Sequence, residues 1–162
     1  MSIPMGGLHN DKLREAGEIA QHLPDEYIGS FVAEESIQFG SGVMRGAEPE
    51  GVKIISSATG EFLGVAGKSF EAGDFDNNKY TEKDPCGVIR KGIVVVCVSE
   101  NVKPGDKVRV RHTASADKPI GIFCKTAEAG KTAVVEFAEW KSETKNGHAV
   151  LWISGPFKLI AD

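Results

Sequence analysis

The chain has 162 residues, of which 41% are hydrophobic and 26% charged, and its 19 Lys and Arg against 23 Asp and Glu give a net charge of −4. This length favours one domain with a sizeable core, and the composition excludes wholesale disorder and collagen-like or coiled-coil architectures. The net negative charge provides no long-range attraction to nucleic acid, and no apolar run approaches the roughly 20 residues of a membrane span, so we expect neither partner. The first residues lack the pattern of a secretory signal, so we expect synthesis in a cytoplasm.

Residues 1–26 are expected to form an N-terminal arm with a short helix, followed by a β-rich domain over residues 27–162. Asn10 or Asp11 is placed to cap the helix, and Pro24 to end it. The apolar residues that recur at helical spacing are Leu13, Ala16, Ala20 and Leu23. A helix this short is marginal alone, so its apolar stripe must lie against the core or a partner.

After Pro24 the pattern changes to short β-type runs separated by Gly, Pro, Asn and Asp. The predicted strands are Tyr27–Ala33, Gly42–Gly46, Val52–Ser56, Phe62–Phe70, Val88–Ser99, Lys107–Thr113, Gly121–Thr126, Ala133–Lys141 and His148–Ser154. Such a series of strands predicts a mainly β fold, a compact antiparallel β-barrel or sandwich preceded by the short N-terminal helix or arm.

Three local patterns refine these strands. Ile93–Val98 is a continuous apolar run, typical of a strand that is covered on both sides. Residues 107–111 alternate strictly between cations and valines, which predicts a strand with one solvated face. Asn146–Gly147 lies between two β-patterned runs and predicts a tight hairpin turn.

The segment from Glu71 to Cys86 is polar and acidic and is expected to be a long surface loop. Asp74, Asp76 and Asn78 have the opening spacing of a calcium loop, but Lys79 and Pro85 stand where that loop requires glycine and glutamate. We therefore favour an acidic turn over a calcium site, and a glycan-binding loop stays open as an alternative.

No constellation of residues indicates catalysis, a cofactor or a metal. The three cysteines, Cys86, Cys97 and Cys124, have no CxxC spacing and are expected to be reduced packing residues. Nucleophilic catalysis needs Ser or Cys beside an oriented histidine, and the nearest candidates are Cys97, His112 and His148. We predict that the chain is not an enzyme.

Two features indicate contacts with a protein partner. The cations Arg109 and Arg111 either form a solvated strand face or pair with carboxylates of an acidic partner. The C-terminal segment around Trp152 and Phe157 is unusually apolar, so it either closes the core or contributes an oligomer interface.

The order of the β segments resembles that of the structural cement proteins of tailed bacteriophages. The matching stretches are Ala33–Gly40 with Gly42–Val43, Ser57–Ala66, Ile89–Val95, Val102–Val108, and Ala138–Ser142 leading through Gly147 to Ala149–Leu151. Each stretch is weak alone, but their order agrees from about Ala33 to Leu151. The N-terminal arm and the tail after Trp152 are longer than the pattern.

The resemblance implies a decoration protein that binds the major capsid protein on the outside of the assembled shell, commonly as a trimer, after synthesis in the host cytoplasm. The apolar residues expected to anchor the partner interface are Leu13, Tyr27, Phe31, Trp152 and Phe157. The charged residues expected there are Arg109 and Arg111. The alternative is a carbohydrate- or receptor-binding module exposed on the virion.

Overall fold

The computed structural model describes residues 15–69, 73–74 and 76–162, and every regular element in this part of the chain is a β-strand. The strands are β1 (Ile19–Gln21), β2 (Tyr27–Ala33), β3 (Ile37–Gln38), β4 (Gly42–Arg45), β5 (Gly51–Ile54), β6 (Phe62–Ala66), β7 (Lys79–Tyr80), β8 (Pro85–Cys97), β9 (Arg109–Arg111), β10 (Phe123–Cys124), β11 (Thr132–Val135), β12 (Ala138–Trp140), β13 (His148–Ser154) and β14 (Leu159–Ala161).

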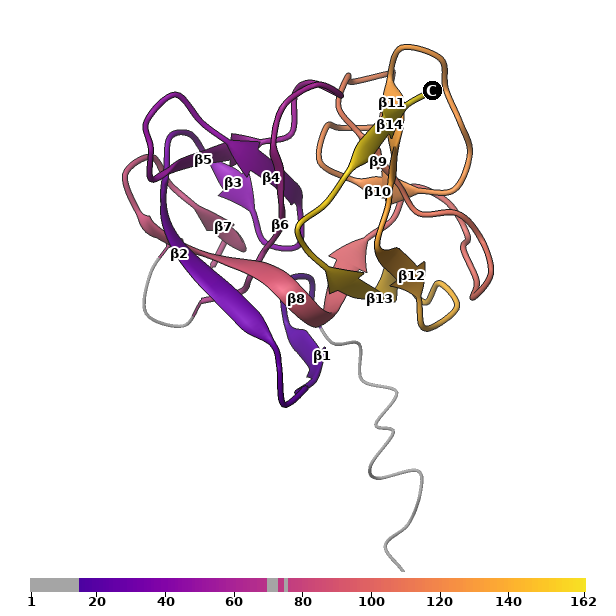
Figure 1. The fold of residues 1–162 in the computed structure, drawn as a ribbon, viewed down its shortest axis with the longest axis horizontal. Helices are drawn as coiled ribbons and strands as arrows, with labels where there is room; N and C mark the ends of the chain where they lie inside the picture. The colour runs from indigo at the N-terminus through magenta and orange to yellow at the C-terminus, as the bar shows by residue number, and fades with distance from the viewer. Residues whose placement is uncertain (1–14, 70–72, 75) are drawn as a thin grey trace, which may run out of the picture.

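The first half of the chain forms a closed β-barrel. The strand order β8-β2-β5-β4-β6 returns to β8, because β6 also pairs with it through Val65 opposite Ile89. The β2–β5 pair is parallel and the other pairs in this ring are antiparallel. Figure 1 shows the barrel strands in indigo to magenta, with β8 running from the barrel into the second half of the molecule.

The second half is built on the far end of β8. There β8 pairs with β13 on one edge and with β1 on the other, and β13 pairs with β12. A separate four-stranded sheet, in the order β10-β9-β11-β14, lies beside them, in orange and yellow in Figure 1. The long strand β8 therefore belongs to both halves.

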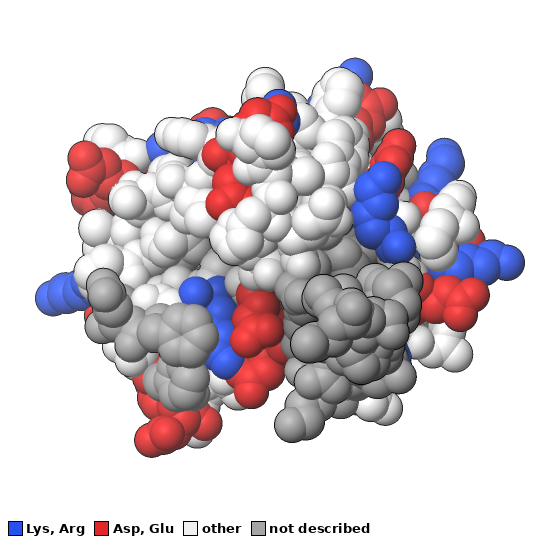
Figure 2. Space-filling model, turned by 90° about the horizontal axis from the view of Figure 1, so that it is seen from below, with Lys and Arg blue, Asp and Glu red and all other residues white. Residues whose placement is uncertain are grey.

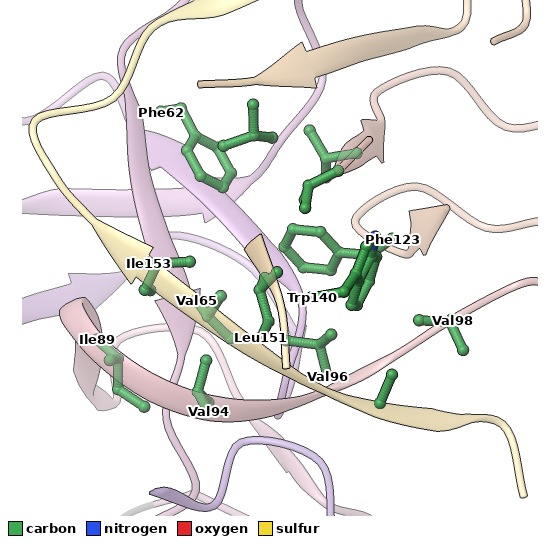
Figure 3. Packing of buried hydrophobic residues seen from close by; sticks show 14 of the residues in the cluster. Phe62, Val65, Ile89, Val94, Val96, Val98, Phe123, Trp140, Leu151 and Ile153 are labelled. Carbon is green, nitrogen blue, oxygen red and sulfur yellow. The ribbon is translucent and has the colours of Figure 1, made fainter. Parts of the chain in front are cut away.

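Two clusters of buried residues fill these halves. One lies in the barrel and includes Val43, Val52 and Leu63. The larger cluster lies between β8, β13 and the second sheet. Figure 3 shows Val94 and Val96 of β8 directed into the same space as Leu151 of β13, with Phe123 and Trp140 packed near them.

The prediction of a mainly β fold with a barrel is confirmed. The strands Tyr27–Ala33 and His148–Ser154 have the predicted bounds. The turn at Asn146–Gly147 is also confirmed, because both residues have positive φ and Lys145 bridges His148 across it.

Two expectations about local structure are wrong, and a third holds only in part. The N-terminal helix is not seen: its described residues form a turn and the strand β1, while its first residues, Leu13 among them, lie outside the described residues. The predicted strand Ala133–Lys141 is two strands in different sheets, separated by Phe137 with φ of 65°. The expectation that Ile93–Val98 is covered on both sides holds in part: Val94, Val95 and Val96 are all buried, whereas Ile93 is partly exposed.

Candidate functional site

The sheet β1-β8-β13-β12 has an outer face that is apolar at its centre. Side chains alternate between the two faces of a strand, and Val94 and Leu151 point into the core, so Ile93 and Trp152 point outward. These two residues pair directly across β8 and β13, and both are partly exposed. Val150, also partly exposed, lies one row further along.

Tyr27 lies at the edge of this outer face. It pairs with Lys91 of β8, which in turn pairs with Ser154 of β13. Its side chain is 58% exposed, and Ile28, the next residue on β2, is 46% exposed. We call Tyr27, Ile93, Val150 and Trp152 the outer apolar row. It brings together two of the predicted interface residues, Tyr27 and Trp152.

The other predicted aromatic contacts have neighbours within the chain. Phe31 is partly buried against the barrel core and lies under the guanidinium of Arg45, at 5.8 Å from the ring centroid. Phe157 packs edge-on against Phe62, with 5.0 Å between the ring centroids, and closes one side of the larger core. The segment after Trp152 thus covers the core, one of the two roles expected for it.

The expected solvated row of cations is wrong for Arg111, whose side chain is only 1% exposed. Its guanidinium pairs with the carboxylate of Glu128, which also accepts a hydrogen bond from Lys118 at 3.2 Å. The bond to Arg111 is the main reason that the pKa of Glu128 is lowered to about 2. Alternation on a strand does not reveal this burial, because the covering residues come from distant loops.

Arg109 is likewise paired within the chain. Its Nε donates to the carboxylate of Asp162 at 3.0 Å, and Nη1 donates to the carbonyl of Lys125 at 2.5 Å. Asp162 also accepts from the hydroxyl of Thr132 at 2.6 Å. These bonds hold the C-terminal strand β14 against β11, so Arg109 stabilises the second sheet from within the chain.

The described residues of the acidic loop have hydrogen bonds within the loop and to the barrel, where the N–H of Phe39 donates to the carbonyl of Asn78 at 2.9 Å and the short strand β7 pairs with β3. Asp74 accepts from the side chain of Asn77 at 2.7 Å, and its backbone bridges Lys79. Within residues 15–69, 73–74 and 76–162, no group of three or more His, Cys, Asp or Glu side chains is arranged to hold a metal ion. The glycan-binding alternative stays a prediction.

The candidate catalytic residues do not assemble into a nucleophile and an oriented base. Cys97 lies opposite His148 across β8 and β13, but burial raises the pKa of its thiol and so disfavours the thiolate. Nδ1 of His148 and Nε2 of His112 are buried without a hydrogen-bond partner. The other nitrogen of His112, Nδ1, lies 3.0 Å from the hydroxyl oxygen of Thr113, so its printed side-chain partner is a hydroxyl and not the carboxylate of a catalytic triad.

Residues 15–21 are clamped to the body where the N-terminal arm joins it. The N–H of Gly17 donates to the carbonyl of Val95 at 2.8 Å, and its carbonyl accepts from the N–H of Lys68 at 2.9 Å. The ammonium of Lys68, only 4% exposed, forms ion pairs with Glu15 and Glu18. Residues 15–18 thus lie beside β8, the strand that contributes Ile93 to the outer apolar row.

Charge is spread in small groups of both signs. On the part of the face in Figure 2 that belongs to described residues, acidic and basic side chains are interspersed in small groups, with a broad uncharged stretch across the middle. This face offers no single-sign patch of the kind that binds a phosphate backbone. No helix among the described residues is long and apolar enough to cross a membrane.

Comparison with known proteins adds a family to this fold. The family model "Structural cement protein (E217 gp24/Pam3 gp6)" matches residues 13–153. A chain in a solved structure, "The capsid of Myoviridae Phage XM1", has the same fold, with a TM-score of 0.73 and 20% identity over 87% of this chain and 90% of that chain. None of the curated proteins matches. Because the family model spans most of the sequence, the chain belongs to the phage structural cement proteins and is a structural component of a phage capsid.

Proposed function

We propose that this protein binds the major capsid protein on the outer surface of the assembled shell, as a homotrimer, and stabilises the contacts between shell subunits. The observation that carries the proposal is the family match over residues 13–153. We propose further that the protein is made in the host cytoplasm and ends on the outside of the virion.

The mechanism requires binding and no covalent chemistry. A ligand that binds only the assembled state stabilises that state by RT ln(1 + [L]/Kd), about 2.7 kcal/mol when its free concentration is 100 times Kd. A trimer that engages several subunits at once adds avidity without any new type of contact. The protein therefore needs a rigid body and exposed contact residues.

We assign the shell contact to the outer apolar row and to the N-terminal arm. Tyr27 is well exposed, and Trp152 is a partly exposed aromatic with Lys141 at 5.9 Å from its ring centroid. Aromatic residues of this kind commonly dominate binding energy at protein interfaces. Leu13 is proposed to contribute through the arm.

The remaining predicted interface residues are proposed to stabilise the folded protein and not to contact the shell. Arg109 and Arg111 brace the second sheet through Asp162 and Glu128, and Phe31 and Phe157 pack against the cores. Their loss should therefore change stability more than shell affinity. The binding energy is then mainly apolar, and it should depend only weakly on salt.

The test uses shells prepared without this protein, to which the purified full-length chain is added before sedimentation. Wild type is expected to sediment with the shells and to raise their disruption temperature. Y27A should weaken binding about tenfold or more, whereas the matched substitution Y80F, deep in the barrel, should not. Shells that sediment without the protein would contradict the proposal.

A truncation tests the role of the N-terminal arm, and a mass measurement tests the homotrimer. Removing residues 1–14 leaves β1 and its clamp intact, so the body should stay folded while shell binding falls. Unchanged binding would exclude the arm. Sedimentation equilibrium should give the mass of three chains, and a monomer at all concentrations would contradict the trimer.

A further inference from the structure

The connection between β11 and β12 is a two-residue corner at which the chain passes from one sheet to the other. The N–H of Glu136 donates to the carbonyl of Lys158 at 2.9 Å, and the carbonyl of Phe137 accepts from the N–H of Ser154 at 2.9 Å. These bonds tie the corner to both sheets. The backbone of Phe137 is thereby held at φ of 65°.

A phenylalanine is an unusual residue for this conformation. The left-handed region costs a residue with a Cβ atom, and for bulky side chains it is rarely occupied. Among the described residues, the other non-glycine positions with positive φ hold Asn, Lys or Ala. Glycine or asparagine would satisfy the corner at lower cost, so the backbone does not explain the aromatic ring.

Burial does not explain the ring either. The side chain of Phe137 is 58% exposed, as exposed as Tyr27, and it belongs to neither core cluster. An exposed aromatic held in a strained conformation is the combination expected where a side chain is retained for an external contact.

The register places this corner at the far end of the outer face from Tyr27. Tyr27 pairs with Lys91, Lys91 with Ser154, and Ser154 bonds to Phe137. Three strand spacings of about 4.8 Å put the two aromatic positions roughly 14 Å apart. That separation fits within one footprint of about 800 Å² per partner.

Behind the corner lies a groove of about 1060 Å³, lined by Trp140 and Ile160 as well as Phe137. Ile160 is itself 43% exposed. The charged side chains along the groove include the ion pairs Arg109–Asp162 and Glu139–Lys141. The charged residues that line the groove carry both signs, three basic and four acidic, so the groove favours a contact on the partner that has little net charge.

We propose that Phe137 is a principal anchor of the shell contact, inserting its ring into a near-neutral apolar depression on a capsid subunit at the opposite end of the outer face from Tyr27. This inference rests on the proposed function. We assign the ring to a capsid subunit because the strand register places Phe137 in line with Tyr27 on the outer face, which the proposed function gives to the shell contact.

Three variants of the full chain separate the contribution of the ring from that of the backbone strain. F137A removes the ring and keeps the strained φ, F137G removes both, and F137Y keeps the ring. F137A and F137G should each bind cement-free shells at least about tenfold more weakly than wild type, and F137Y should bind within about twofold. F137G should melt a few degrees above F137A, because glycine accepts positive φ. Binding then follows the ring and not the stability.

Lys83 provides the matched control, because it is exposed and has φ of 73° elsewhere in the barrel half. K83A and K83G should differ in melting temperature as the Phe137 pair does, and both should bind shells like wild type. Shell binding by F137A equal to that of wild type would overturn the inference. So would an F137A that alters only the self-association of the free protein. Failure of wild type itself to bind shells would instead refute the proposed function.

Discussion

The substitution G17A tests whether residues 15–21 are fixed to the body. A Cβ at this position would lie 2.7 Å from the backbone nitrogen of Lys68 and 3.0 Å from the carbonyl oxygen of Ala66, and Gly17 has φ of 85°. Left-handed strain costs about 1–2 kcal/mol. Loss of the two backbone hydrogen bonds of Gly17 adds about 0.5–1.5 kcal/mol each. The expected loss is about 2–5 kcal/mol, limited by the free energy of undocking this segment.

Hydrogen-exchange rates of two backbone amides measure how firmly residues 15–21 are bound to the body. The N–H of Val95 donates to the carbonyl of Glu18 at 2.9 Å, and that of Lys68 donates to Gly17. A destabilisation of about 2.8 kcal/mol would speed exchange at both amides about 100-fold, since each 1.4 kcal/mol is a factor of ten. The same preparation should melt several degrees below wild type.

Gly130 gives the control, because it has φ of 72° and a Cβ there would meet nothing within 4 Å. G130A therefore carries the backbone strain alone, and its melting temperature should fall by about half as much as that of G17A or less. Equal losses in the two variants, with unchanged exchange at Val95, would refute the close packing of Gly17 as the reason for its presence.

Three further outcomes are expected. L151A should lower the free energy of unfolding by about 2–5 kcal/mol in denaturant titrations, because Leu151 is fully buried, whereas V150A on the partly exposed outer face should cost about 1 kcal/mol or less. The pKa of Glu128 is lowered from 4.5 to about 2, so its ion pair stabilises the fold fully above pH 4.5, and this stabilisation is lost as the pH falls towards 2. In E128Q the free energy of unfolding should therefore fall less between pH 4.5 and pH 2 than it does in wild type. Burial raises the pKa of Cys86 to about 12, so iodoacetamide should modify this thiol slowly in the native protein and fast in denaturant.

Local signals in the sequence identified the parts of the fold whose structure is decided locally. The alternation in Tyr27–Ala33 and His148–Ser154 matches the pleat of strands with one face on the core. Asn146 and Gly147 both accept positive φ, which is what a two-residue hairpin turn requires.

Features that depend on distant residues were not predictable in this way. Strand β1 exists because its backbone pairs with Val94 and Ile93, more than 70 residues away. Arg111 is buried because Glu128 approaches it from a later loop, although its own strand alternates like a solvated one. The chain turns sharply at Phe137 without a glycine, proline or asparagine there to indicate it.

In the candidate site too, some residues could be predicted from local sequence and others depend on the pairing of distant strands. Trp152 is predicted at the interface from the apolar C-terminal segment and Tyr27 as an aromatic anchor near the N-terminal arm, and the structure places both on one face of the sheet. That Phe137 lies in line with them follows only from the register of β8, β13 and the corner. The sequence signal for Phe137 was an apolar residue inside an apparent strand, which indicates burial and not exposure.

The arrangement of β8 explains how a small protein keeps this face fixed. One half of the strand pairs with β2 in the barrel, and the other half pairs with β13 beside the larger core. Both cores therefore hold the same backbone, and the positions of Tyr27 and Trp152 are set by pairing to this one strand. A contact surface ordered before binding loses little conformational entropy on docking, so more of its interaction energy remains as affinity.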